Sequence, residues 1–408
     1  MERKQLDTLE TLQLSDCEDQ ILNRKEFAKG WNGQVYRHSP RELTQLYGES
    51  VSDQVQAQAS YVQLDLKPDG ILVVKKVAHA KVHPDVQAQY KAGQLANGKE
   101  RICVGIVPIL GLWHCNPGSD YFVMPSLDDS LMRFLSRKDL TNSSQIDIKS
   151  FLLPNFMRIT TALLACHSRG ITHSDLSLAN LLLSSGSTTQ AYMCHYRGMD
   201  LLVPPSNLVW SLTDFGFDQS TSITDPHHED RIVRDFKRWN ECMYMILSFP
   251  AIRSRLPKKE RVQWLVLLLN LGLDPEKLSE PDSTAVFLDT SVQVNETSAS
   301  LRLPWNRLLV NRYHPLLAPY MGPNVVAHES WTVTRLSPIT TTNVPVPSVL
   351  KRDRSQSPKK DRNTTSPLRT PRSMKCQRPA SSLTSYHPMH LSSSSSIQPL
   401  DSCCCVLS

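Results

Sequence analysis

The sequence predicts an α+β fold, with strands concentrated in the first third of the chain, helices after them and a disordered tail at the end. Three observations predict it. Residues 71–77 are rich in β-branched side chains, as strands are. Apolar residues recur every three or four positions between 151 and 169, as in a helix. Residues 331–402 are rich in Ser, Thr and Pro, and such segments bury too little apolar surface to offset the entropy of ordering.

Length and composition set the first limits. The 408 residues, 40% of them apolar, suffice for two lobes with a core and a tail. No apolar run reaches about 18 residues, so no transmembrane helix is expected. The first residues lack the apolar segment of a signal peptide. Six cysteines are scattered without Cys-x-x-Cys spacing, which predicts reduced thiols rather than disulfides or zinc ligands. They are Cys17, Cys103, Cys115, Cys166, Cys194 and Cys242.

The net charge of +6 is unevenly distributed. Residues 331–408 contain 11 Lys/Arg and 3 Asp/Glu, a net charge of +8, so residues 1–330 carry −2. The basic tail suits an anionic membrane surface or a nucleic acid, or is simply solvated. We expect no specific nucleic-acid partner.

The N-terminal elements come first in the chain. Residues 1–24 are polar and predict an extension containing a short helix. A hairpin is expected next, because Gly30 and Gly33 are followed by the strand-forming Val35 and Tyr36. Residues 38–69 are polar, rich in Gln and predicted to be an insertion. The strand over residues 71–77 carries Lys75, with Lys76 as the alternative if the register shifts by one. Residues 102–111 and 121–124 predict two buried strands.

The central stretch, residues 170–183, contains His173, Asp175 and Asn180 between an apolar helix and three leucines. Asp175 is suited to accept a hydroxyl proton, and Asn180 to offer an oxygen to a divalent cation. After the strand-like residues 208–212, Asp214 supplies a second carboxylate. Helices are predicted from Asp235 through residue 247 and at about 257–272 and 301–312, with the folded part ending near residue 324.

These segments resemble the catalytic loop, the Asp-Phe-Gly motif, the glycine loop and the lysine strand of protein kinases. The chain is similar to divergent eukaryotic-type serine/threonine protein kinases, and its compact C-terminal part and insertions resemble kinases of large DNA viruses. The resemblance implies a bilobal protein-kinase-like domain over residues 25–325, after the extension 1–24. Its small β-rich N-lobe would span 25–124, and its helical C-lobe 128–325.

The resemblance also implies ATP and Mg²⁺ as cofactors and a protein as substrate. Lys75 would contact the α- and β-phosphates, Asp175 would orient and deprotonate the acceptor hydroxyl, and Asn180 and Asp214 would hold Mg²⁺. His173, Phe215, Gly216 and Asp235 would have structural roles, Asp235 by anchoring the catalytic-loop backbone. The nucleotide would contact Ala28, Gly30, Gly33, Val35, Lys75, Met124, Leu127 and Leu182, with Met124 as gatekeeper and residues 125–127 as hinge.

The chain departs from the family pattern at several places. The carboxylate partner of Lys75 is not evident, and Asp85, Gln94 and Glu100 are the residues near the expected place. Ser174 and Ser177 stand where protein kinases often carry Arg and Lys. No Ala-Pro-Glu motif follows Gly216. The 39 positions between Asp175 and Asp214 predict a second insertion.

Three hypotheses for the function remain. A protein kinase is favoured, with Ser/Thr preferred to Tyr as acceptor on frequency alone. A small-molecule kinase of the aminoglycoside phosphotransferase kind shares the His-x-Asp motif with Asn five residues beyond the Asp. A membrane-tethered pseudokinase scaffold is the third.

The tail carries Ser-Pro and Thr-Pro pairs, such as Ser357-Pro358, that are candidates for phosphorylation. The chain ends in a C-a-a-X box headed by Cys405, preceded by Cys403 and Cys404, which are candidates for palmitoylation. A prenyltransferase is therefore an expected partner, and the cytoplasmic face of membranes the expected location, with the basic residues supplying the second membrane signal. Residues 351–354 form a nuclear-localisation pattern, so cytoplasm or nucleus is the alternative.

Overall fold

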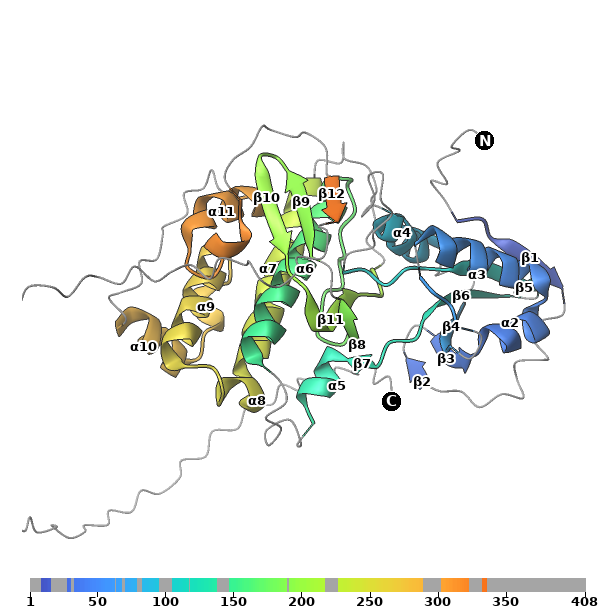
Figure 1. Cartoon of the computed structure of the whole chain (residues 1–408), viewed down its shortest axis with the longest axis horizontal. Coiled ribbons are helices and arrows are strands. Elements are labelled where there is room, and N and C mark those ends of the chain that lie inside the picture. Colours follow the sequence, from blue (N-terminus) through green and yellow to red (C-terminus); the bar gives the residue numbers. More distant parts are fainter. Residues whose placement is uncertain are drawn as a thin grey trace, which may run out of the picture. The chain divides into compact units, whose positions relative to one another are not determined.

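The computed structural model of the chain describes residues 9–15, 28–30, 33–62, 64–67, 70–78, 83–94, 105–116, 118–137, 147–188, 191–216, 227–288, 302–322 and 332–335. The fold is mixed α and β, as predicted, with strands predominant in the first third and helices afterwards (Figure 1). Most of the predicted tail, including Cys403, Cys404 and Cys405, lies outside the described residues.

A six-stranded sheet forms the N-terminal part, in the order β1-β5-β6-β4-β3-β2. All neighbours are antiparallel except β1 and β5, which are parallel. The predicted glycine hairpin (β2 and β3) and lysine strand (β4) are confirmed. The strands are β1 (Leu12–Ser15), β2 (Ala28–Gly30), β3 (Gly33–His38), β4 (Leu72–Ala78), β5 (Gly111–Asn116) and β6 (Ser119–Pro125).

Three helices accompany this sheet: α2 (Pro40–Tyr47), α3 (Glu49–Tyr61) and α4 (His83–Gln94). The first two occupy the stretch in which the sequence analysis recognised only a polar insertion. A local signal was present, because Ser39 and Glu42 form a reciprocal capping box and Pro40 follows at the first helical position. Tyr47 of α2 packs against Trp113 of β5, with ring centroids 4.6 Å apart. This contact fastens the insertion to the sheet.

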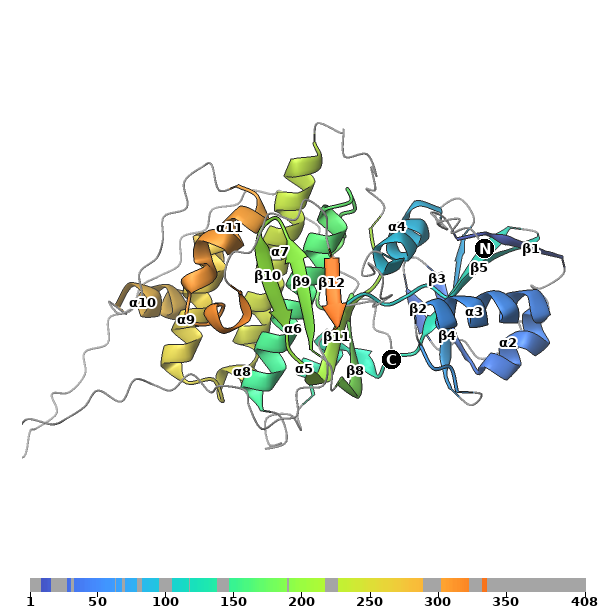
Figure 2. The same cartoon turned by 45° about the horizontal axis from the view of Figure 1, so that its top comes forward.

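The C-terminal part is mainly helical (Figure 2). Its helices are α5 (Leu131–Leu135), α6 (Ile148–His167), α7 (His228–Ser248), α8 (Pro250–Arg253), α9 (Lys258–Asn270), α10 (Glu280–Leu288) and α11 (Pro304–Val310). Two three-stranded sheets complete it, in the orders β11-β8-β7 and β10-β9-β12. Their strands are β7 (Asp129–Ser130), β8 (Leu181–Thr188), β9 (Tyr192–Tyr196), β10 (Met199–Val203), β11 (Ser206–Leu212) and β12 (Thr332–Arg335).

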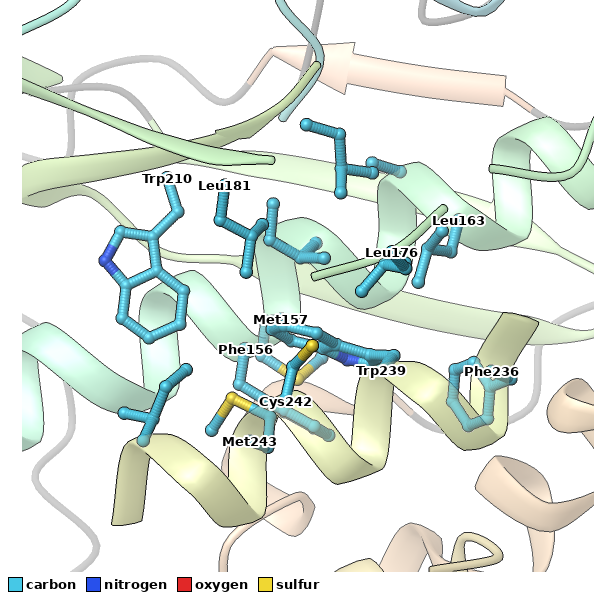
Figure 3. Close-up of a cluster of buried hydrophobic side chains, with 14 of the residues drawn as sticks. Phe156, Met157, Leu163, Leu176, Leu181, Trp210, Phe236, Trp239, Cys242 and Met243 are labelled. Carbon is cyan, nitrogen blue, oxygen red and sulfur yellow. The ribbon is translucent and has the colours of Figure 1, made fainter. Parts of the chain in front are cut away.

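The core of this part lies around α6 and α7 (Figure 3). Phe156 of α6 packs on Trp239 of α7, with ring centroids 5.9 Å apart, and the Trp239 indole donates to Thr160 Oγ1 at 3.0 Å. Asn155, fully buried, joins α6 to β11 by donating to Leu208 O and accepting from Trp210 N. These contacts position the end of β11, and therefore the residues that follow it.

Four predictions of element boundaries are corrected. Of the strand expected over 102–111, residues 102–104 lie outside the described residues, and within 105–111 the strand begins only at Gly111, because Pro108 has no N–H and Gly105 takes a φ of +75°. Helix α7 begins at His228, so Asp235 lies inside it rather than at its start. Within the predicted helical extension 1–24, residues 12–15 form β1. The pairing of β12 with β9 extends the ordered chain past residue 324.

The expectation of reduced thiols is wrong for Cys115 on β5, which is disulfide-bonded. Cys166, Cys194 and Cys242 are free and buried, and burial raises the pKa of Cys194 and Cys242 to about 12, so they pack as apolar side chains. Among the helices of the described chain, none is both long and apolar enough to span a bilayer.

Candidate active site

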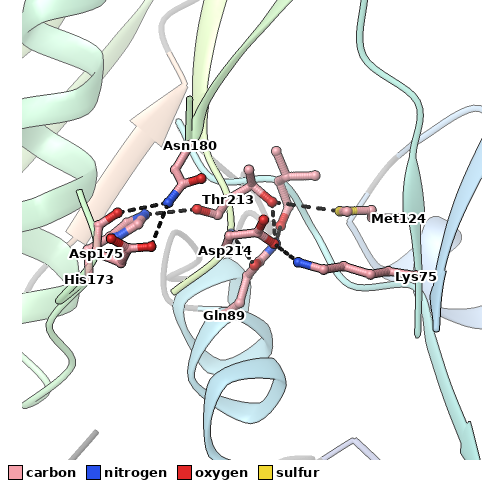
Figure 4. A network of polar contacts seen from close by, with 9 residues as sticks. Lys75, Gln89, Met124, His173, Asp175, Asn180, Thr213 and Asp214 are labelled. Atoms are coloured by element: carbon pink, nitrogen blue, oxygen red, sulfur yellow. Dashed lines mark hydrogen bonds and ion pairs between the residues drawn. The ribbon is translucent and has the colours of Figure 1, made fainter. Parts of the chain in front are cut away.

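The pleat of β4 separates the two candidate lysines. Lys75 Nζ lies 2.8 Å from Asp214 Oδ1 (Figure 4). Lys76 Nζ lies instead over the ring of Tyr121, 5.7 Å from its centroid. Because neighbouring strand residues face opposite ways, only one lysine can enter the site. The structure thereby selects Lys75, the first of the two alternatives.

The glycine hairpin lies beside Lys75 in the sheet. Val35 pairs with Ala28 on one side and with Lys75 on the other, so the three positions are cross-strand neighbours. Gly33 has a φ of +150°, and a Cβ there would lie 2.1 Å from the carbonyl oxygen of Lys76. Only glycine fits at position 33, because a side chain there would collide with the backbone of β4.

The loop that carries Asp175 follows α6. Helix α6 ends at His167, and Gly170 with a φ of +79° turns the chain, as the sequence predicts. Asp175 N donates to His173 O at 2.8 Å across Ser174, which has a φ of 63°. This tight three-residue turn exposes the Asp175 carboxylate. Asn180 Nδ2 donates to Asp175 O at 2.8 Å and to Asp175 Oδ2 at 3.1 Å, which fixes the two side chains together.

His173 packs behind the Asp175 carboxylate, against the segment 213–216. It is fully buried, its ring stacks on Phe215 at 4.5 Å, and its Nε2 lies 2.9 Å from Thr213 O. Because a carbonyl only accepts, Nε2 carries the proton. Burial lowers the pKa of His173, although nearby carboxylates including Asp235 and Asp175 oppose the effect. A neutral His173 therefore joins the Asp175 loop to the segment 213–216.

Asp235 of α7 anchors the same loop. It is 2% exposed and accepts from His173 N at 2.9 Å and Ser174 N at 3.2 Å, while His167 Nε2 lies 2.8 Å away. Burial by itself would raise the pKa of Asp235, but the hydrogen bonds from His167 and from the His173 backbone give a pKa below the ordinary value. The carboxylate stays ionised and holds the turn.

Asp214 has an unusual backbone, with a φ of 55°. Non-glycine residues in this region are uncommon and need support from their surroundings. Gln89 of α4 supplies it, because its Oε1 accepts from Asp214 N at 2.9 Å. The sequence analysis missed Gln89 because it sought a carboxylate partner for Lys75. A search for any buried polar residue on the helix after β4 would have found it.

Gly216 brings the two motifs into contact. Its N–H donates to His173 O at 2.7 Å, and a Cβ built on it would lie 3.1 Å from Asp175 Cβ. A side chain here would push against the Asp175 loop. The glycine of the Asp-Phe-Gly motif is thus needed for close packing at this position.

Three of the residues expected around adenine form an apolar group beside Thr213. Met124 and Leu182 are buried in one apolar cluster, against which Leu127 packs, and Thr213 Oγ1 lies 3.7 Å from Met124 Sδ. Along the expected hinge, Ser126 N already donates to Ile71 O, and Pro125 has no N–H. Of the two backbone N–H groups in this stretch, that of Leu127 has no acceptor within the described part of the chain and remains for a ligand.

Asp128 and Asp129 directly follow the expected hinge. Asp128 Oδ2 accepts from Ser185, and Asp129 accepts from Ser130 N and pairs with Arg137. Both acids are engaged by protein groups just before α5, where negative charge also suits a helix N-terminus.

The donor set suits Mg²⁺ bound together with a nucleotide. Mg²⁺ prefers oxygen ligands and is commonly held by one or two carboxylates plus substrate phosphates. Asp214 offers a half-exposed carboxylate, and Asn180 uses Nδ2 for Asp175, which leaves Oδ1 as an acceptor. Within the described part of the chain, no group of three or more His, Cys, Asp or Glu is arranged as a metal site. Asp214 and Asn180 would hold Mg²⁺, with phosphate oxygens as the other ligands.

Glu100 and the side chains of Asp85 and Gln94, the other residues considered beside Lys75, fall outside the described parts. No protein-family model matches the chain, and a search of curated proteins returned no match.

Proposed function

We propose that this chain is an ATP-dependent protein kinase with a bilobal kinase-like fold, and that it transfers the γ-phosphoryl group to Ser/Thr hydroxyls of proteins. The observation that carries the proposal is the joining of two distant motifs at one centre. Lys75 meets Asp214, and the segment 213–216 is bonded to the loop that holds Asp175 and Asn180. Two cation ligands, a phosphate ligand and a base are the parts that phosphoryl transfer requires.

Each side chain has a distinct task in this proposal. ATP with Mg²⁺ supplies the transferable phosphoryl group. Lys75 binds phosphate oxygens, and Asp214 and Asn180 hold the cation. Asp175, exposed and oriented by Asn180, accepts the hydroxyl proton of the substrate. Asp235 and His173 touch none of the reacting atoms and keep the loop in place.

The site is proposed to be assembled without loop phosphorylation. Ser174 stands where many kinases carry an Arg that pairs with a phosphorylated residue, and here it forms the turn next to Asp175. Its hydroxyl lies 3.0 Å from Thr172 Oγ1. Because Ser174 has no charge, it cannot respond to a phosphate as a guanidinium does. Control by position in the cell then becomes more plausible, which agrees with the lipidation motif at Cys405.

A turnover assay tests the proposal. Wild type, Asp175→Ala and Asp214→Ala are compared in ATP turnover with Mg²⁺, using a protein mixture and a panel of aminoglycosides as acceptors. We expect wild-type turnover on protein Ser/Thr and a loss of about 100-fold or more in each variant. Turnover on aminoglycosides alone would favour a small-molecule kinase. Wild-type turnover no higher than that of the variants would refute both enzymes and favour a pseudokinase scaffold.

A further inference from the structure

Gln89 occupies a position that links three parts of the site. It is 3% exposed and lies on α4. Its Oε1 accepts from Asp214 N at 2.9 Å, and its Nε2 donates to Val107 O at 2.9 Å and lies 3.4 Å from Thr213 Oγ1 (Figure 4). One amide therefore joins the Asp214 N–H to the Val107 carbonyl and lies beside the Thr213 hydroxyl. An amide can donate and accept at the same time, whereas an ionised carboxylate has no proton for Val107 O.

The position of α4 depends in turn on residues far up the chain. Two residues before Gln89, the side chain of Gln87 makes a reciprocal pair with the Leu9 backbone. Leu9 N donates to Gln87 Oε1 at 3.1 Å, and Gln87 Nε2 donates to Leu9 O at 3.0 Å. The Leu9 side chain is 4% exposed and belongs to the apolar cluster that also contains Val86 and Tyr90 of α4. Leu9 thus fastens α4 by polar and apolar contacts together.

The sheet holds Leu9 in place. Residues 12–15 form β1, which pairs in parallel with β5. Between Leu9 and β1, Gln54 of α3 donates to Glu10 O at 2.7 Å and accepts from Leu112 N at 2.9 Å. The segment 9–15, which we call the N-terminal segment, is therefore integrated into the sheet and ends against α4. It is not the separate extension that the sequence predicts.

We propose that Gln89 is a positioning residue for phosphoryl transfer, and that the N-terminal segment sets its position through the Leu9–Gln87 pair. The inference rests on the proposed function for its catalytic consequence. Asp214 holds a left-handed backbone conformation that few residues adopt without support, and the Gln89 amide is the contact from α4 that supports it. Displacing the N-terminal segment would loosen α4 and release the Asp214 carboxylate from its orientation toward Lys75.

Two measurements on the full chain test this. The first is hydrogen–deuterium exchange in peptides covering residues 208–216, which reports the protection of Asp214 N–H and requires no activity. The second is kcat and KM for ATP at several Mg²⁺ concentrations.

The variants are Gln89→Ala, the isosteric Gln89→Glu, Gln87→Ala and a deletion of residues 2–15. Gln56→Ala on α3, an exposed glutamine with the same substitution, is the matched control. Circular dichroism establishes folding, and Gln89→Glu replaces Gln89→Ala if the latter does not fold.

We expect faster exchange at Asp214 in Gln89→Ala, in Gln87→Ala and in the deletion, and exchange at the wild-type rate in the Gln56→Ala control. Gln89→Glu keeps an acceptor for Asp214 N–H but loses the donor to Val107 O, so its increase should be smaller. In Gln89→Ala, kcat should fall by about 10- to 100-fold and the Mg²⁺ requirement should rise, as when a group supporting a metal ligand is lost. Gln87→Ala and the deletion should shift the same quantities in the same direction.

Unchanged exchange and kcat in Gln87→Ala and in the deletion would overturn the role of the N-terminal segment. Unchanged values in both Gln89 variants would overturn the role of Gln89. Faster exchange with no turnover in the wild type would support the coupling and refute the kinase.

Discussion

Lys75 and Lys76 show that a shift of one position along a strand changes what a side chain contacts. They are adjacent on β4, yet one side chain contacts Asp214 and the other lies over Tyr121. The first is 14% exposed and lies over the Phe122 ring as well, at 5.7 Å. The same substitution at both positions therefore tests the proposed role of Lys75 in the site against the packing of Lys76 on Tyr121.

We expect Lys75→Met to lower ATP turnover by about 100-fold or more, because the phosphate-binding charge is lost. Lys76→Met should stay within about threefold of wild type, since that side chain faces away from Asp214. Steady-state kinetics with both variants checks the prediction. Equal losses in the two variants would contradict the assignment of Lys75.

Asp235→Asn should lower the free energy of unfolding at pH 7 by about 3–5 kcal/mol, as expected when one partner of a buried ionic contact is removed. The folded state lowers the pKa of Asp235 below its ordinary value of 3.8. A lowered pKa stabilises the fold above the unfolded pKa, and this contribution disappears as the pH falls through the folded pKa. The difference between wild type and variant should therefore shrink below about pH 4. Urea unfolding from pH 7 to pH 3 checks it, and a difference that stays constant would contradict the ionised state.

At the scale of elements, strong local sequence patterns predicted helices and strands correctly. The short strands depend instead on pairing with a partner strand. Helix α6 follows apolar spacing and ends at Gly170, and β4 is a β-branched run. In contrast, β1 and β12 are four-residue strands that form where a partner edge is available. Their sequences, Leu-Gln-Leu-Ser and Thr-Val-Thr-Arg, suit a strand but are too short to predict one.

The strand β12 supplies an element-scale prediction. It covers the edge of β9 that does not pair with β10, so a chain ending at residue 325 should melt about 2–4 °C below a chain ending at residue 336. The physical reason is that truncation leaves the β9 backbone groups without their ladder partners. Differential scanning fluorimetry on the two chains checks it, with the full-length protein as the reference. Identical melting temperatures would show that β12 contributes nothing to stability.

At the scale of the whole molecule, the proposed catalytic part and the lipidation motif lie at opposite ends of the basic tail in sequence. One lipid gives marginal membrane binding, and a second lipid or basic residues make it stable. In this proposal the terminal cysteines would be the lipid acceptors and the 11 basic residues of 331–408 would supply the second signal.

We expect Cys405→Ser to move the protein from the membrane to the soluble fraction, because it removes the prenyl acceptor and with it the primary anchor. Cys376→Ser, in the same tail but outside the C-a-a-X box, is the control and should leave fractionation unchanged. Membrane flotation in sucrose gradients measures both. Retention of Cys405→Ser at the membrane would refute prenylation as the anchor.

The sequence by itself determined the residue types of the candidate centre, since Lys75, Asp175, Asn180 and Asp214 each belong to a short motif with local punctuation such as Gly170 and Gly216. It also determined the helices and strands whose apolar spacing is strong. Only the tertiary structure decided which lysine faces Asp214, that an amide on α4 holds Asp214, and that residues 9–15 belong to the sheet. The physical reason is distance along the chain. Gln89 and Asp214 are 125 residues apart, and a hydrogen bond between them leaves no periodic trace in either segment.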